Sequence, residues 1–214
     1  RRYVDETLTL FSGTSTSGVG LQGLMLSAMQ PALLEKMLRR NAAEESLIQE
    51  LVAQQEKRID TMKAHLKNTT FQMVISLPRI TDVLKGKVTA LVPELLLQKP
   101  VTYLPLEFLE HLRSVIKLLE DFGKLEIVII PNKHMLHNVQ IFAMQNSGML
   151  VLKHNDPKFV FISEQKDLIS AMIGYIRQVA SRVPKREKNK VYVTEKLREF
   201  AKRVEEGAAM RMLP

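Results

Sequence analysis

Two histidines three residues apart, His134 and His137, come closest in this chain to a pattern that could bind a metal. Lys133 stands beside them, and an apolar run ending at Ile130 precedes them. A protein zinc site needs a third or fourth ligand nearby. No acidic residue stands close to the pair in a ligand pattern, so we interpret both histidines as polar loop residues and expect no metal site.

Covalent catalysis needs a nucleophile, a base and a group that orients the base. The chain has no Cys and no Gly-x-Ser-x-Gly motif, and its acidic pairs, such as Glu120 with Asp121, stand in helical segments. Neighbouring residues on a helix point in different directions. We also expect His111 on the surface of its helix. We therefore predict no catalytic residue, no cofactor and no enzyme activity, with a hydrolase or transferase assembled from distant residues as the weakest alternative.

Basic residues gather near the C-terminus and could contact phosphates. Between Arg182 and Arg203 the chain has nine basic residues and three acidic ones, and the chain as a whole carries a net charge of +8. The candidate nucleic-acid contacts are Lys185, Arg186, Lys188 and Lys190. Base readout needs a recognition helix or exposed aromatic residues, and a solvated basic face explains the cluster equally well. A basic nucleic-acid-binding accessory protein is the alternative function.

Composition excludes several other classes of protein. The 214 residues are 45% hydrophobic, which suits a packed fold and excludes wholesale disorder. No apolar run approaches the roughly 18 residues of a membrane span, and no stretch has the order of a signal peptide. We expect a cytoplasmic protein with no membrane partner. Because the chain begins at Arg1, we expect either processing or a missing N-terminal domain.

We divide the chain into four predicted segments. Residues 1–30 are an N-terminal segment with a Gly/Ser-rich linker, and residues 31–68 are a long amphipathic helix. An apolar seam of Ile48, Val52, Ile59, Met62 and Leu66, with Gln55 at one step, makes a coiled-coil dimer or simple packing possible. Residues 69–183 are an α/β domain, and residues 184–214 are a basic linker with a C-terminal helix.

The α/β segment shows both helical and strand periodicity. The predicted strands are 71–77, 125–130, 139–144, 149–153 and 159–162, with a hairpin at 145–148. The predicted helices are 80–85, 105–122 and one from an N-cap at Ser163 to about Arg182, with a tail helix at 195–206 that Gly207 ends. The fold class is α/β or α+β, a central mixed sheet flanked by helices, preceded by a long helix and followed by a C-terminal helix.

Open α/β sheets bind ligands beyond the carboxyl ends of their strands. The strand ending at Ile130 therefore points to the loop that follows it, and Arg79 follows the first strand of this segment. Our predicted ligand site consists of Arg79, Asn132, Lys133, His134 and His137. Its basic character suits a small anionic effector.

Several segments together resemble a known family. They are Leu104–Leu112, Leu125–Pro131, Asn138–Phe142, Met149–Leu152 and Phe159–Ile162. Their arrangement resembles the C-terminal effector-sensing domains of bacterial helix-turn-helix transcription regulators, and is similar to the sensor domains of TrmB-type regulators. The resemblance implies a ligand-sensing and dimerisation region, acting as a homodimer, with DNA bound through a domain that is not in this chain.

Overall fold

The structure is a computed structural model that describes residues 17–22, 24–41, 43–90, 101–131, 139–153 and 159–211. The chain forms two compact units. The sheet unit takes its residues from 1–23, 60–77 and 122–193, and the helical unit from 24–59, 78–121 and 194–214. Each of the four predicted segments contributes to both units, because residues distant in sequence pack together.

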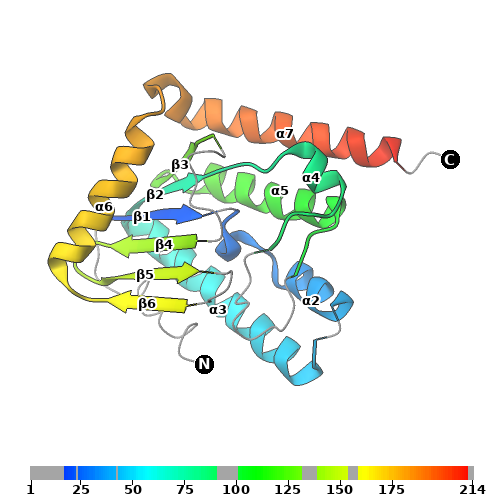
Figure 1. Ribbon diagram of the computed structural model, residues 1–214, viewed down its shortest axis with the longest axis horizontal. Coiled ribbons are helices and arrows are strands. Elements are labelled where there is room, and N and C mark those ends of the chain that lie inside the picture. The colour runs from blue at the N-terminus through cyan, green and yellow to red at the C-terminus, as the bar shows by residue number, and fades with distance from the viewer. Residues whose placement is uncertain are drawn as a thin grey trace. The chain divides into compact units, whose positions relative to one another are not determined.

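The sheet unit contains a six-stranded mixed sheet in the order β3-β2-β1-β4-β5-β6 (Figure 1). β1 pairs in parallel with β2, and β2 with β3, whereas β4, β5 and β6 join the other side of β1 through antiparallel pairs. The strands are β1 (Ser17–Gln22), β2 (Thr70–Ile75), β3 (Leu125–Ile129), β4 (Val139–Met144), β5 (Gly148–Lys153) and β6 (Phe159–Ser163). The predicted mixed α/β sheet and its hairpin are confirmed.

Strand β1 is an interior strand that the sequence analysis missed, because it lies within the segment predicted as N-terminal linker. Gly18 and Gly20 alternate along it with the buried Val19 and Leu21. A Cβ at Gly18 would lie 2.3 Å from the Met144 sulfur and 2.7 Å from the Phe71 ring. Glycine therefore marks close approach of neighbouring side chains here, although it is also typical of a linker.

Helix α6 (Lys166–Ser181) packs on one face of the sheet, against β1, β4 and β5 (Figure 1). The shared core includes Val19, Val74, Val128, Ile141 and Ile176, all almost fully buried. The predicted N-cap at Ser163 is wrong: α6 begins at Lys166, after the N-cap residue Gln165. The Ser163 hydroxyl instead accepts a hydrogen bond from the Gln165 amide, at 3.2 Å, in the turn before the helix.

Helices make up the second unit and also contribute to the first. They are η1 (Leu26–Ala28), α2 (Pro31–Arg40), α3 (Glu45–Asn68), α4 (Ile80–Leu84), α5 (Pro105–Asp121), η4 (Lys185–Lys188) and α7 (Lys190–Met210). The 3₁₀-helix η4 and the first residues of α7 belong to the sheet unit, as do residues 60–68 of α3. The predicted C-terminal helix is confirmed and starts five residues earlier than expected.

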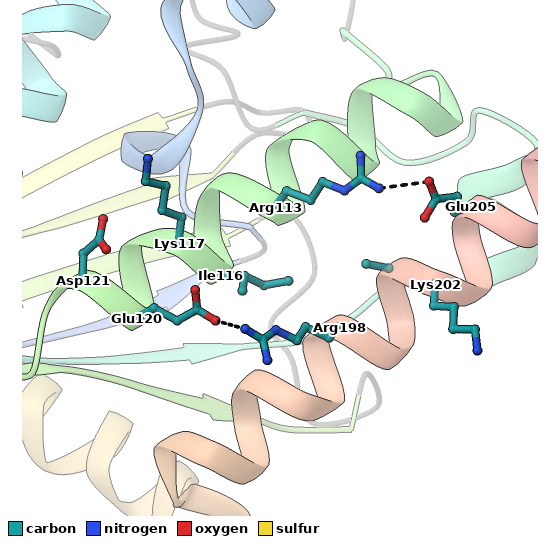
Figure 2. Close-up of a pocket in the computed structure, with 9 residues that line it drawn as sticks. Arg113, Ile116, Lys117, Glu120, Asp121, Arg198, Lys202 and Glu205 are labelled. Atoms are coloured by element: carbon teal, nitrogen blue, oxygen red, sulfur yellow. Dashed lines mark hydrogen bonds and ion pairs between the residues drawn. The ribbon is translucent and has the colours of Figure 1, made fainter.

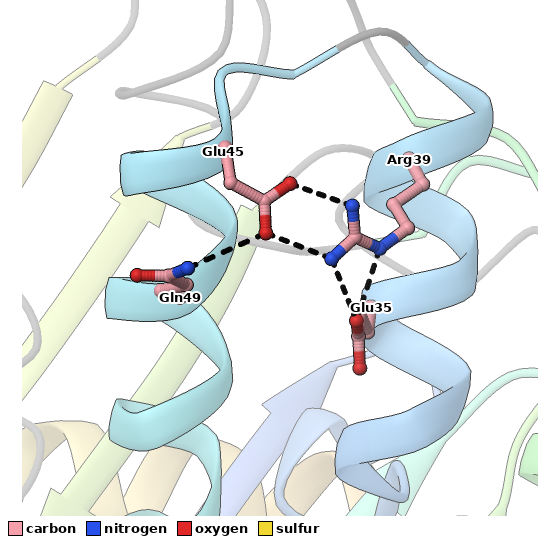
Figure 3. Close-up of polar contacts among 4 residues, drawn as sticks. All are labelled: Glu35, Arg39, Glu45 and Gln49. Carbon is pink, nitrogen blue, oxygen red and sulfur yellow. Dashed lines mark hydrogen bonds and ion pairs between the residues drawn. The ribbon is translucent and has the colours of Figure 1, made fainter.

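The single long helix predicted over residues 31–68 is wrong, because the chain breaks between α2 and α3. Asn41 ends α2, where its side-chain amide donates to the Met37 carbonyl at 2.7 Å. Arg39 then pairs with Glu45 across the turn at 2.6 Å, and with Glu35 on its own helix at 2.9 Å (Figure 3). Hydrogen bonding to Arg39 lowers the pKa of Glu45. No Gly or Pro marks this break.

The apolar seam of α3 is buried within the chain, which removes the predicted coiled-coil surface. Ile48 is 2% exposed, Met62 is fully buried and Leu66 is 1% exposed. The polar step, Gln55, is also fully buried, and its amide donates to the Met29 carbonyl at 2.8 Å. Of the two readings of the seam, the structure supports simple packing.

Two glycines of the helical unit have different roles. Gly86 adopts a φ of 65° directly after α4, the left-handed conformation that commonly ends a helix. Gly207 does not end the tail helix, because α7 continues to Met210. A Cβ at Gly207 would lie 2.6 Å from a methyl group of Leu84, so its role is close packing.

We predict that Gly18→Ala lowers the free energy of unfolding by about 1–3 kcal/mol, because the new methyl group overpacks a closed interior. Gly174→Ala is the matched control, since Gly174 lies in α6 with nothing within 4 Å of an added Cβ. That variant should instead be stabilised by up to about 1 kcal/mol through helix propensity. Urea unfolding measures both, and equal effects would contradict the close approach at Gly18.

Candidate functional site

A polar pocket lies at the amino ends of the three parallel strands. Ser17 is aligned with Thr70, and Val19 with Gln72, which in turn is aligned with Glu126. Because alternate residues of a strand share a face, these polar side chains share a face with the core that α6 covers. That face is therefore polar at the amino ends of the strands and apolar towards their carboxyl ends.

The last turns of α6 and the following 3₁₀-helix supply the other wall of this amino-edge pocket. Arg177, Ala180 and Ser181 line it from α6, and Lys188 lines it from η4. The pocket has a volume of about 230 Å³. It suits a small ligand, because drug-sized ligands occupy roughly 300–1,000 Å³.

Some polar groups of the pocket are already engaged. The Ser17 hydroxyl donates to the Gln145 side chain at 2.8 Å, and the Gln72 amide donates to Glu126 at 3.1 Å. The Ser181 hydroxyl donates to the Gln178 carbonyl. These contacts hold the wall of the pocket in place.

The basic side chains of the pocket differ from these hydrogen-bonded polar groups. Within the part of the chain that the structure describes, neither Arg177 nor Lys188 forms an ion pair. They outnumber the single pocket carboxylate, Glu126. Arginine presents a planar fork of donors and lysine a compact charge, and both bind phosphate or carboxylate oxygens. The arrangement can bind a small anion with hydroxyl groups close by.

Most of the ligand site predicted from the sequence lies outside the described residues. This applies to Asn132, Lys133, His134 and His137, and their assignment stays a prediction. Arg79 is described and exposed, and its carbonyl accepts from Asp82 at the start of α4. Arg79 belongs to the helical unit, whereas the strand before the histidine loop belongs to the sheet unit.

The predicted nucleic-acid residues lie in η4 and at the start of α7. Lys185 and Arg186 are exposed, and Lys188 is half-buried against the amino-edge pocket. The Lys190 ammonium donates to the Phe122 carbonyl at 3.4 Å. The four residues therefore have different surroundings, and two of them remain open to a nucleic acid.

Arg177, Ser17 and Thr70 were not among the predicted site residues. Arg177 is one of several polar residues on the outer face of an amphipathic helix, and nothing in its spacing singles it out. Its partners in the pocket become visible only when Ser17–Gln22 is recognised as a strand. The alternation of Gly18, Val19, Gly20 and Leu21 was the available signal.

A second polar cluster lies buried in the helical unit around His111. His111 is fully buried, so its predicted surface position is wrong. Its Nε2 lies 2.7 Å from the Met25 carbonyl, and its Nδ1 lies 2.6 Å from the Tyr103 hydroxyl. A carbonyl oxygen only accepts, so Nε2 carries the proton and Tyr103 donates to Nδ1. Both ring nitrogens are thus occupied, which leaves no free base.

Charge and burial explain the titration of this cluster. Burial lowers the pKa of His111 to about 4, against the smaller opposing effect of the hydrogen bond to Met25. Burial, together with the negative charge of Glu107, raises the pKa of Tyr103 above its usual range. Glu107 accepts from the Leu104 amide at the start of α5 and pairs with Arg40 at 2.8 Å. These contacts fasten α2 to the start of α5, which is a structural role.

A groove of about 560 Å³ lies between α5 and α7 in the helical unit (Figure 2). Two ion pairs cross it, Arg113 with Glu205 at 3.0 Å and Arg198 with Glu120 at 2.6 Å. All four side chains are substantially exposed, and such pairs are worth only about 0–1 kcal/mol each. Lys202, which also lines the groove, pairs with Glu206 at 3.8 Å. Because three of the four basic side chains of the groove are ion-paired, it is a weaker candidate for an anion site than the amino-edge pocket.

Comparison with known proteins adds no relative: no model of a protein family, no curated protein and no solved structure matches this chain. Among the described residues no cluster of three or more His, Cys, Asp or Glu side chains could hold a metal. No described helix is both long and apolar enough to span a membrane.

We predict that His111 makes the protein less stable in acid. In the unfolded state His111 gains a proton below about pH 6.5, whereas in the folded state it stays neutral down to about pH 4. Stability is therefore lost as pH falls between these values, by about 2–4 kcal/mol from this residue. Urea unfolding from pH 7 to pH 4 measures the loss.

The double variant Tyr103→Phe/His111→Phe should lack this part of the acid sensitivity, because the titrating group is gone. Tyr103→Phe alone should keep this acid sensitivity. Its free energy of unfolding at neutral pH should be lower by about 1–3 kcal/mol, since Nδ1 of His111 then lacks a hydrogen-bond donor. Identical acid dependence in wild type and double variant would show that His111 titrates normally.

Proposed function

We propose that this chain is the ligand-sensing and dimerisation region of a bacterial transcriptional regulator, and that its effector is a small anion. The amino-edge pocket carries this proposal, because Arg177 and Lys188 converge there beside the Thr70 hydroxyl. The resemblance in the order of helices and strands supports the regulatory context. DNA contact would come from a domain that is not in this chain.

The pocket gives such an effector a physical means of action. Its walls come from different elements, β1 to β3 on one side and α6 with η4 on the other. An anion that binds both walls favours the arrangement in which they are close. η4 passes directly into α7 through Asn189, whose side chain accepts from the Val191 amide at 2.9 Å. A displacement of η4 is therefore transmitted to the first turn of α7.

We predict that wild-type protein binds inorganic phosphate or malonate measurably in calorimetry, and that Arg177→Gln/Lys188→Gln weakens this binding at least tenfold. Tenfold corresponds to about 1.4 kcal/mol, a modest value for two lost charges. The matched control is Arg182→Gln/Lys185→Gln, which removes the same charge from exposed positions outside the pocket lining. The control should stay within about twofold of wild type, as expected for screened charges.

Lys133→Ala/His134→Ala is the complementary variant, because it alters the loop after Ile130 in which the sequence predicts the ligand site. Unchanged affinity in that variant, with loss in Arg177→Gln/Lys188→Gln, assigns the anion to the amino-edge pocket. The reverse result assigns it to the loop after Ile130. If neither anion binds wild type, the amino-edge pocket is not an anion site.

A nucleic-acid-binding accessory protein is the second candidate, favoured by the exposure of Arg182, Lys185 and Arg186 in one turn region. Deletion of the tail is a poor test, because Leu197 and Val204 of α7 are fully buried. Substitution of single basic residues leaves the buried residues of α7 in place and therefore tests this function more directly.

If this second reading is correct, Lys185→Gln/Arg186→Gln should weaken binding to a duplex of random sequence. The slope of log affinity against log salt should fall by about two, because each phosphate contact contributes roughly 0.9. Fluorescence anisotropy at several salt concentrations measures both quantities. An unchanged slope, or no binding by wild type at low salt, would exclude this role for the basic cluster.

A further inference from the structure

Strand β6 forms one edge of the sheet and exposes large apolar side chains. It pairs with β5 alone in the sheet order. Phe159 is 45% exposed, Phe161 is 44% exposed and Ile162 is 39% exposed. The strand Phe159–Ser163 carries no charge and no proline. Natural proteins usually block an edge with one of these features, because an open edge pairs with other chains.

The opposite edge of the same sheet is protected. η4 packs against β3, and the one exposed residue of β3 is the charged Glu126. The two edges therefore differ in cover and in charge. Within the described residues, no element lies beyond β6 in the sheet.

We infer that β6 is a dimerisation edge and that its occupant is β6 of a second copy of this chain, paired antiparallel about a twofold axis at Phe161. In that register Phe161 meets its own counterpart, Val160 meets Ile162, and Phe159 meets Ser163. Apolar residues thus oppose apolar residues in all but the outermost pair. A C₂ interface requires such self-complementarity, and the lack of charge means that nothing repels across the axis.

The pairing also continues the layers of each sheet unit. Phe161 is aligned with Val151 of β5, which packs on the core beneath α6, and Ile162 is aligned with the fully buried Leu150. Both faces of β6 therefore extend existing apolar layers. The Lys153 ammonium lies 5.9 Å from the centre of the Phe159 ring, at the end of the strand away from the axis.

The expected affinity of this dimer follows from the length of the paired strands. Two five-residue antiparallel strands form about four to six main-chain hydrogen bonds, depending on which residues face outward. The buried surface is well below the roughly 800 Å² per partner of a stable complex. We therefore expect a weak dimer that dissociates on dilution in the micromolar range. The inference extends the dimerisation part of the proposed function and does not depend on anion binding.

Sedimentation velocity of the full chain between about 1 and 500 µM tests the proposal. Wild type should change from monomer to dimer over this range, and Phe161→Lys should remain monomeric because two like charges meet at the axis. Val191→Lys is the matched control, since Val191 is an exposed apolar residue of α7 outside the sheet. It should dimerise like wild type.

A mixed-charge experiment gives the sharpest result. Phe161→Glu alone should also be monomeric, whereas an equimolar mixture of Phe161→Glu and Phe161→Lys should form heterodimers, because only a twofold at this residue brings the two together. A wild type that is monomeric at every concentration would overturn the proposal. A dimer that survives Phe161→Lys would also overturn it, since another surface must then form the contact.

A third overturning result would be a monomeric wild type that dimerises once residues 1–16 are deleted, because the chain's own N-terminal segment would then occupy the edge. Anion affinity, measured separately on Phe161→Lys, should equal that of wild type. Because dimerisation and anion binding are measured separately, a wild type that binds the anion but stays monomeric contradicts this inference alone, and one that dimerises but binds no anion contradicts the effector site alone.

Discussion

The pairing of β1 between β2 and β4 is the constraint on which the sheet unit depends. β1 joins the parallel strands to the antiparallel ones, so without it the sheet would separate into the pair β3-β2 and the three strands β4-β5-β6. The strand can occupy this position because glycines stand where the side chains of Phe71, Met73 and Met144 cross it. A residue with a Cβ would push these buried side chains away and weaken the pairing on both sides.

The candidate site follows from the same strand. Because β1 and β2 are parallel and in register at Ser17 and Thr70, their amino ends lie side by side. The alternation that places Val19 in the core places Ser17 at the open end of the same face. α6 covers the apolar part of that face, and its last turn brings Arg177 over the polar part. The pocket thus lies where α6 extends beyond the apolar part of the sheet face and covers the polar part.

Periodicity was sufficient to predict most of the sheet. Val139–Met144 and the hairpin after it were predicted at their observed positions, because apolar strands joined by an Asn- and Gly-containing turn have few other readings. β1 was predicted as linker, since two of its first four residues are glycine and the strand alternation rests on Val19 and Leu21 alone. The break at Asn41 was also hidden, because no Gly or Pro marks it; the Asn41 side chain ends α2 on the Met37 carbonyl, and the Arg39–Glu45 ion pair spans the turn.

The site was harder to predict than the fold, because its residues come from five separate elements. Lys188 was noted for its charge alone, and Arg177 was indistinguishable from other polar residues of α6. The misassignment of His111 has a related cause. Helical spacing placed it beside the apolar stripe, but only tertiary contacts with Tyr103 and Met25 bury it completely. Burial of a polar residue depends on partners that local sequence does not reveal.

Helix α6 connects the two proposed activities of the sheet unit. The parallel half of the sheet carries the amino-edge pocket, and the antiparallel half carries the open edge at β6. α6 begins three residues after β6 ends, packs across β5, β4 and β1, and finishes at the pocket wall. An anion bound in the pocket would contact the end of the helix whose first turn follows β6, the edge proposed for dimerisation. By thermodynamic linkage, an effect of the anion on dimerisation would require an equal effect of dimerisation on anion affinity, so equal anion affinity in the monomer and the dimer would mean that α6 supports both sites without coupling them.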